Sequence, residues 1–259
     1  MLLPRRKRQQ IFLKGILILL GLVAAGGLVI AAFYIPSLRL SSIVIEGLSP
    51  AETKILREEI EQILSQKYFY VFPKDNFILF PKEKVEILLK AKPRLREFLM
   101  EREFPSTLKI FLKERETWAV WCQKDAKKSC LFLDAEGFAF GAAPAFSGTA
   151  VLKIIDERNE EFIGKNIMSS AQFQKLAALV ERLPRRAKEE VSAIEIKISG
   201  NTFRLHLKSG WYITTDEETD VDRALENLAL ALNSEIKESR AKLEYVDLRF
   251  PDKVFYRYK

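Results

Sequence analysis

An uninterrupted apolar run dominates the hydropathy pattern near the start of the chain. Residues 15–35 form a stretch of 21 residues without a charged side chain. As a helix rising about 1.5 Å per residue, this run reaches about 31 Å, which matches a bilayer hydrocarbon core of about 30 Å. The pattern therefore predicts a membrane-spanning helix over residues 15–35, preceded by a short tail, residues 1–14.

The charges around this run indicate its orientation. The tail has no acidic residue and five basic ones, Arg5, Arg6, Lys7, Arg8 and Lys14. By the positive-inside rule, the tail stays in the cytoplasm and residues 36–259 lie across the membrane of a single-pass protein. A cleaved signal peptide is the alternative, because Ala31 and Ala32 suit a cleavage site, although its apolar region is usually about 7–15 residues long.

Residues 36–116 alternate between strand and helix patterns. A strand containing Ile43 and Ile45 ends at Gly47, and Ser49, Pro50 and Glu52 then form the capping box of a helix. A second helix is expected over residues 81–91, followed by a hairpin in which apolar and polar residues alternate from Leu108 to Leu112. The predicted order is strand, helix, helix, strand, strand.

Residues 117–259 predict a mixed β-domain with flanking helices. A hairpin around the two cysteines leads to a further strand and to a helix over residues 169–183, which Pro184 is expected to end. A meander follows, and then a helix that reaches about Asn233, with Thr215 and Glu218 as its capping box. Two strands close the chain, so the fold class of the whole is α+β.

The charge balance argues against a nucleic-acid partner. The formal net charge is +7, but five of the 42 Lys and Arg residues lie in the tail. Residues 36–259 therefore carry 37 basic and 35 acidic side chains. This small excess lacks the strong positive charge that binding of a polyanion requires.

The two cysteines, Cys122 and Cys130, lie on the side of the membrane to which residues 36–259 are assigned. An oxidising compartment and a hairpin between them favour a disulfide bond, and two buried free thiols are the alternative. A metal site is not expected, because the pair lacks CxxC spacing and the chain has a single histidine.

The sequence contains no convincing set of catalytic residues. Ser-x-x-Lys occurs three times, at Ser106, Ser234 and Ser239, but without the Lys-Thr-Gly partner of penicillin-binding enzymes. His206 occupies an outward position of an alternating strand, and the acidic run over residues 216–222 lacks the spacing of a calcium loop and fits helix capping. We therefore expect neither enzymatic activity nor a cofactor, a metal or a small-molecule substrate.

Two phrases in the sequence resemble the FtsQ/DivIB family of bacterial cell-division proteins. The first lies within residues 103–121, where the matching positions are Phe104, Pro105, Thr107, Leu108, Ile110, Glu114, Arg115, Ala119 and Trp121. The second comprises Tyr245, Asp247, Leu248, Arg249, Phe250, Pro251 and Asp252. Thr117 departs from the proline that is usual in this family.

The resemblance implies a domain order and a cellular role. It implies a POTRA (polypeptide-transport-associated) domain over residues 36–116 and an FtsQ-type β-domain over residues 117–259. It also implies an inner (cytoplasmic) membrane protein at the division septum, a divisome scaffold that binds FtsB/DivIC-like and FtsL-like single-span proteins. The alternative is a membrane-anchored POTRA dock or chaperone for secreted polypeptides.

The expected docking site is the last strand, residues 253–259. It has apolar or aromatic groups on both faces, and a terminal strand is well placed to be a sheet edge that accepts a partner strand. With the preceding helix, the residues assigned to partner binding are Val254, Phe255, Tyr256 and Tyr258. The alternative is that these side chains fill the core.

Overall fold

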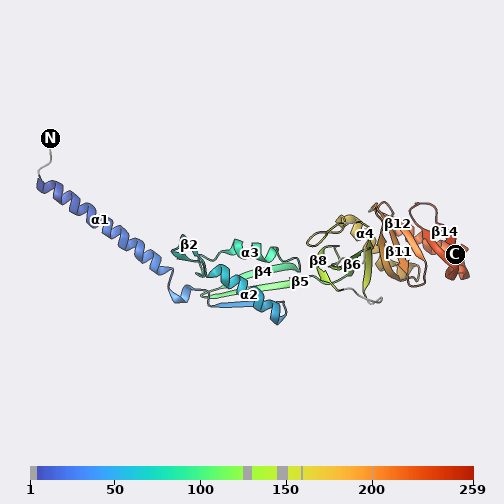
Figure 1. Ribbon diagram of the computed structural model, residues 1–259, viewed down its shortest axis with the longest axis horizontal. Helices are drawn as coiled ribbons and strands as arrows, with labels where there is room; N and C mark the ends of the chain where they lie inside the picture. The colour runs from blue at the N-terminus through green and yellow to red at the C-terminus, as the bar shows by residue number, and fades with distance from the viewer. Residues whose placement is uncertain (1–4, 125–129, 145–150, 159, 200) are drawn as a thin grey trace. The chain divides into compact units, whose positions relative to one another are not determined.

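The computed structural model describes residues 5–124, 130–144, 151–158, 160–199 and 201–259, with side chains from residue 12 onward. The chain divides into two compact units, Met1–Glu114 and Arg115–Lys259, called here the first and second units. Figure 1 shows helices and strands in both. The fold is α+β, with an apolar N-terminal helix and a large mixed sheet.

The N-terminal helix, α1, covers Arg5–Ala32. Its segment Phe12–Ala32 is long and apolar enough to cross a membrane, with a mean hydropathy of 2.6. The helix begins inside the basic tail and ends before Ile35, so the predicted boundaries of residues 15–35 are shifted at both ends. Ile35 is extended, because a residue that precedes a proline is disfavoured in the helical region.

The first unit contains a three-stranded sheet in the order β1-β5-β4, with β1 parallel to β5. Its elements after α1 are η1 (Pro36–Leu38), β1 (Ser42–Glu46), α2 (Pro50–Leu64), β2 (Lys67–Tyr68), β3 (Phe72–Pro73), α3 (Lys82–Lys90), β4 (Leu95–Glu103) and β5 (Thr107–Glu114). Both helices pack on one face of the sheet, in a core that includes Ile45, Ile60, Leu89 and Ile110.

The helix start predicted for α2 is confirmed. Ser49 is its N-cap and accepts a hydrogen bond from the Glu52 N–H, and Pro50 opens the helix. Gly47, which precedes this cap, has a φ of +97°, and a Cβ there would lie 1.8 Å from the carbonyl oxygen of Leu112. Only glycine lets the chain turn from β1 into α2 so close to β5.

The second unit is organised around a nine-stranded mixed sheet in the order β14-β13-β12-β11-β10-β9-β6-β7-β8. The strands are β6 (Ala119–Gln123), β7 (Cys130–Leu133), β8 (Ala139–Ala143), β9 (Leu152–Asp156), β10 (Val191–Ile196), β11 (Thr202–Leu207), β12 (Tyr212–Asp216), β13 (Leu243–Asp247) and β14 (Phe255–Tyr258). A core that includes Trp121, Phe173, Ile194, Leu228 and Val246 joins the sheet to its helices.

The helices of the second unit are α4 (Ser170–Arg186) and α5 (Val221–Ala231), followed by η2 (Leu232–Ile236) and η3 (Lys237–Lys242). Pro184 lies inside α4, so the expectation that it ends the helix is wrong. The helix continues because Leu183 and Ala187, 0% and 4% exposed, bury apolar surface on either side of the proline.

The capping box predicted at Thr215 and Glu218 is also wrong. Thr215 belongs to β12, and the N-cap of α5 is Asp220, whose side chain accepts a hydrogen bond from the Arg223 N–H. The Asp216 carboxylate accepts from the N–H groups of Glu218 and Thr219, which forms a turn between β12 and α5. Asp216 and Asp220 therefore bind backbone N–H groups. The sequence pattern predicts such a capping role for the whole acidic run.

A disulfide bond joins Cys122 at the end of β6 to Cys130 at the start of β7, with the two Cα atoms 4.3 Å apart. The two strands pair antiparallel, so the bond links neighbouring strands of one hairpin. Both cysteines belong to a small satellite core with Val120 and Ala143, against which Phe132 packs.

Candidate docking edge

Strand β14 forms one edge of the nine-stranded sheet and pairs antiparallel with β13. Along β14, the backbone N–H and C=O groups of successive residues point alternately toward β13 and away from it. The N–H of Lys259 donates to the carbonyl oxygen of Lys242 at 2.9 Å, so the backbone groups of Phe255 and Arg257 also face β13. The N–H and C=O groups of Tyr256 and Tyr258 consequently face away from the sheet, in the direction from which another strand would pair.

The predicted docking side chains divide between the core and the surface. Val254 and Tyr256 are partly buried against the main core, and the Tyr256 hydroxyl lies 3.3 Å from Glu235 Oε2 in η2. Phe255 and Tyr258 are 49% and 39% exposed. The alternative that these side chains fill the core therefore holds for Val254 and Tyr256, whereas Phe255 and Tyr258 stay accessible.

The exposed rings extend to neighbouring residues. Phe255 makes an edge contact with Phe250, with ring centroids 4.9 Å apart, and Phe250 is itself 47% exposed. Tyr258 makes a similar contact with Tyr256 at 5.5 Å. Desolvation, followed by the Glu235 carboxylate, raises the pKa of Tyr256, so this hydroxyl stays protonated. The edge thus combines unpaired backbone groups with accessible aromatic surface.

The connection from β13 to β14 is held by a bidentate ion pair. The Asp247 carboxylate accepts from Arg249 Nε at 2.9 Å and from its Nη2 at 2.6 Å, and also from the Arg249 N–H. The Asn227 amide of α5 donates to the carbonyl oxygen of Pro251 at 2.9 Å. These bonds explain why an Asp-x-Arg sequence precedes the edge strand, a role that the sequence pattern did not reveal.

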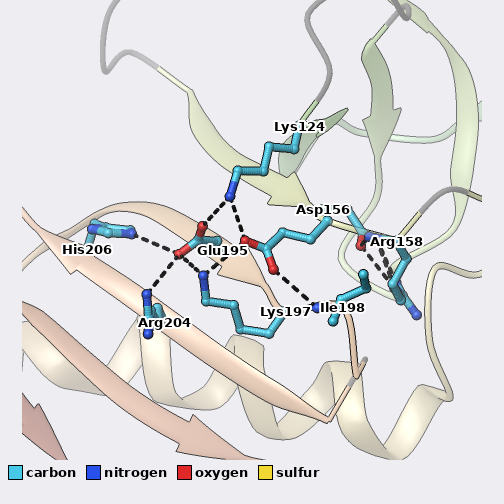
Figure 2. Close-up of polar contacts among 9 residues, drawn as sticks. Lys124, Asp156, Arg158, Glu195, Lys197, Ile198, Arg204 and His206 are labelled. Atoms are coloured by element: carbon cyan, nitrogen blue, oxygen red, sulfur yellow. Dashed lines mark hydrogen bonds and ion pairs between the residues drawn. The ribbon is translucent and has the colours of Figure 1, made fainter.

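The same Asp-x-Arg geometry occurs at the end of β9. Asp156 accepts from Arg158 Nε at 3.0 Å and from its Nη2 at 2.7 Å, and also from the indole N–H of Trp121 at 2.9 Å. Arg158 donates further to the carbonyl oxygen of Ile167. Figure 2 shows Arg158 beside Asp156.

A charged cluster covers part of the sheet face opposite the core. Glu195 lies between Ile194 and Ile196, which are fully buried, so its side chain is on the other face of β10. Figure 2 shows basic groups from several strands around it. Its carboxylate oxygens lie 2.9 Å from Lys197, 3.6 Å from Lys124 and 3.8 Å from both Arg204 and His206.

Glu157 completes this cluster. Its Oε1 accepts from Lys124 at 2.6 Å and from Lys197 at 3.0 Å. These two hydrogen bonds lower the pKa of the Glu157 carboxyl from 4.5 to about 2. A carboxylate that holds its charge so firmly is a poor general base near neutral pH, so the arrangement serves to join β6, β9 and β10.

Replacing Glu157 by glutamine is expected to destabilise the second unit by about 1–2 kcal/mol at pH 7, after allowance for solvent screening. Because the pKa is lowered on folding, the contribution is fully present above about pH 5 and is lost as the pH falls towards 2. Urea unfolding followed by tryptophan fluorescence measures the difference at each pH.

Glu190→Gln is the matched control, because Glu190 pairs with Lys208 but both side chains are more than half exposed. Its expected effect is below about 0.5 kcal/mol. A Glu157→Gln effect that stayed constant from pH 7 to pH 3 would contradict this account of the cluster.

Among the residues that the structure describes, no group of three or more His, Cys, Asp or Glu side chains is arranged to hold a metal ion. His206 is at the surface, as expected, and faces Glu195 and the ring of Tyr212. No protein-family model and no curated protein matches the sequence.

Proposed function

We propose that the protein is a non-enzymatic bacterial cell-division scaffold of the FtsQ/DivIB type. It is anchored in the inner membrane by α1, with the tail in the cytoplasm and both folded units outside. It binds a single-span, FtsB- or DivIC-like division protein, with an FtsL-like protein beside it. No nucleic acid, cofactor or small-molecule substrate takes part.

The observation that carries this proposal is the free edge of β14. The backbone groups of Tyr256 and Tyr258 face away from the sheet, and the rings of Phe255 and Tyr258 are accessible beside them. Such an edge binds an extended segment by main-chain hydrogen bonds, while side-chain contacts supply specificity. An accessible edge of this kind also invites aggregation, so a bound partner that covers it would protect the protein.

Two further features support the proposal. The elements β1, α2, α3, β4 and β5 follow one another in the first unit, with the short β2–β3 hairpin between the two helices, and β1 is parallel to β5. This order supports the POTRA-like module proposed for residues 36–116, although the hairpin was not expected. The disulfide between Cys122 and Cys130 fits a location outside the cytoplasm, where such bonds persist.

The experiment that tests the proposal is localisation in dividing cells, with a fluorescent protein fused ahead of Met1. We expect a band at midcell that appears with constriction. A fusion that carries only residues 1–35 is the control, and it should label the whole membrane evenly. Even labelling by the complete chain would contradict the division role and favour the POTRA dock for secreted polypeptides. Loss of the membrane signal would contradict the anchor and favour a cleaved signal peptide.

A further inference from the structure

The short hairpin of β2 and β3 is held against the residues that follow the membrane-spanning segment. The ring of Phe33 contacts that of Phe72, with centroids 5.6 Å apart, and the Tyr34 hydroxyl donates to the carbonyl oxygen of Val71 at 2.5 Å. Phe33 and Tyr34 are the first two residues after α1. Since one residue spans at most about 3.6 Å, these contacts keep the hairpin close to the point where the chain leaves the membrane.

The tip of this hairpin consists of two aromatic residues without support from the fold. Phe69 and Tyr70 are 87% and 96% exposed. Both have positive φ angles, +49° and +63°, at the two central positions of the turn that the Val71 N–H closes on the carbonyl oxygen of Tyr68. Two successive positive φ angles in a turn favour asparagine and glycine. Two large aromatic residues at strained positions gain no packing in the first unit, so a contact outside the chain is needed to explain them.

Other exposed apolar side chains lie at the same end of the first unit. Phe104, 74% exposed in the turn between β4 and β5, contacts the ring of Phe77, whose N–H bonds to the carbonyl oxygen of Leu38. Ile78 is 65% exposed beside Phe77. Leu38 lies only six residues beyond α1, so this second group of apolar side chains also belongs to the membrane-proximal end.

We propose that Phe69 and Tyr70 insert into the headgroup region of the bilayer beside α1, with Ile78 and Phe104 at the same level. Aromatic side chains favour this region because their rings are apolar while the tyrosine hydroxyl can still reach water. The ammonium group of Lys67, 5.4 Å from the ring of Tyr34, is placed near lipid phosphates. The hairpin gives the first unit a second attachment to the bilayer, independent of the partner bound at β14.

The test uses the full chain in vesicles of phosphatidylcholine with a minority of phosphatidylglycerol. Tyr70→Trp places a reporter at the tip, and lipids brominated near the headgroup quench tryptophans that reach them. We expect quenching of this reporter by at least about twofold, after subtraction of the signal from Trp118, Trp121 and Trp211. Unchanged fluorescence of Tyr70→Trp in the brominated vesicles would overturn the proposal.

Ile55→Trp is the matched control. Ile55 is 56% exposed on α2 and lies near Leu48 and Leu95, at the end of β1 remote from Ser42. This reporter should not be quenched. Equal quenching of both reporters would also overturn the proposal, because it would mean that the unit lies on the lipid without a preferred face.

A second variant separates the role of the aromatic rings from that of the turn. Phe69→Asn with Tyr70→Gly gives the turn its preferred residues, so the hairpin should fold at least as well. With Phe104→Trp as reporter in the same vesicles, we expect quenching to fall by about half or more when the tip is changed. Equal quenching with either tip would contradict the insertion of Phe69 and Tyr70.

Discussion

Replacing Asp156 by alanine is expected to destabilise the second unit by about 3–5 kcal/mol, the largest effect of any single substitution considered for this protein. The Asp156 side chain is fully buried, and it holds both the guanidinium group of Arg158 and the indole N–H of Trp121. Its removal leaves two groups without their acceptor: the guanidinium group of Arg158, whose side chain is only 16% exposed, and the buried indole N–H of Trp121.

Asp247→Ala is the matched control, because Asp247 and Arg249 repeat the Asp–Arg hydrogen bonds at the end of β13 without the bond to an indole N–H. Here the guanidinium group is 38% exposed, so water replaces the lost carboxylate more readily. The expected cost is about 1–2 kcal/mol. Urea unfolding measures both variants, and tryptophan fluorescence reports on the second unit alone because Trp118, Trp121 and Trp211 all lie within it. Equal costs would contradict the role assigned to burial.

Replacing Tyr258 by proline is expected to weaken binding of the proposed division partner about tenfold more than Tyr258→Ala does. Both variants remove the ring, but proline also removes an N–H that faces away from the sheet and places its own ring in the path of an incoming strand. The bonds between β14 and β13 stay intact, because edge strands tolerate proline at outward-facing positions. Titration of the partner's extracytoplasmic segment into the full chain measures the difference.

Arg257→Pro completes this comparison. The backbone groups of Arg257 face β13, so proline there should loosen β14 from its own sheet and destabilise the second unit. If Tyr258→Pro bound the partner as tightly as Tyr258→Ala, the partner would not pair with the backbone of β14. Side chains alone would then form the docking site.

Local patterns predicted the helices and strands of this protein well, because each depends on neighbouring residues. The alternation of Leu108, Ile110 and Leu112 defines the buried face of β5, and Ser49 with Pro50 marks the start of α2. The error at Pro184 arose where tertiary burial outweighed a local preference, since Leu183 and Ala187 keep α4 helical around the proline.

The apolar and polar pattern does not predict which strands pair when they are far apart in the sequence. The parallel contacts of β9 with β6 and β10 depend on which strands meet after folding, and the Glu195 cluster follows from that pairing. The sequence pattern predicts no hairpin at Phe69 and Tyr70, because the exposure and positive φ angles that distinguish its tip belong to the folded chain. The terminal position of β14, by contrast, correctly suggested a sheet edge.

Whether β14 is the docking edge is measured by the affinity of the proposed division partner for a chain that lacks residues 253–259. We expect binding to be lost while urea unfolding, followed by tryptophan fluorescence, shows that the remainder of the second unit still folds. Unchanged affinity, relative to the chain of 259 residues, in a truncated protein that remains folded would show that the docking site lies away from β14.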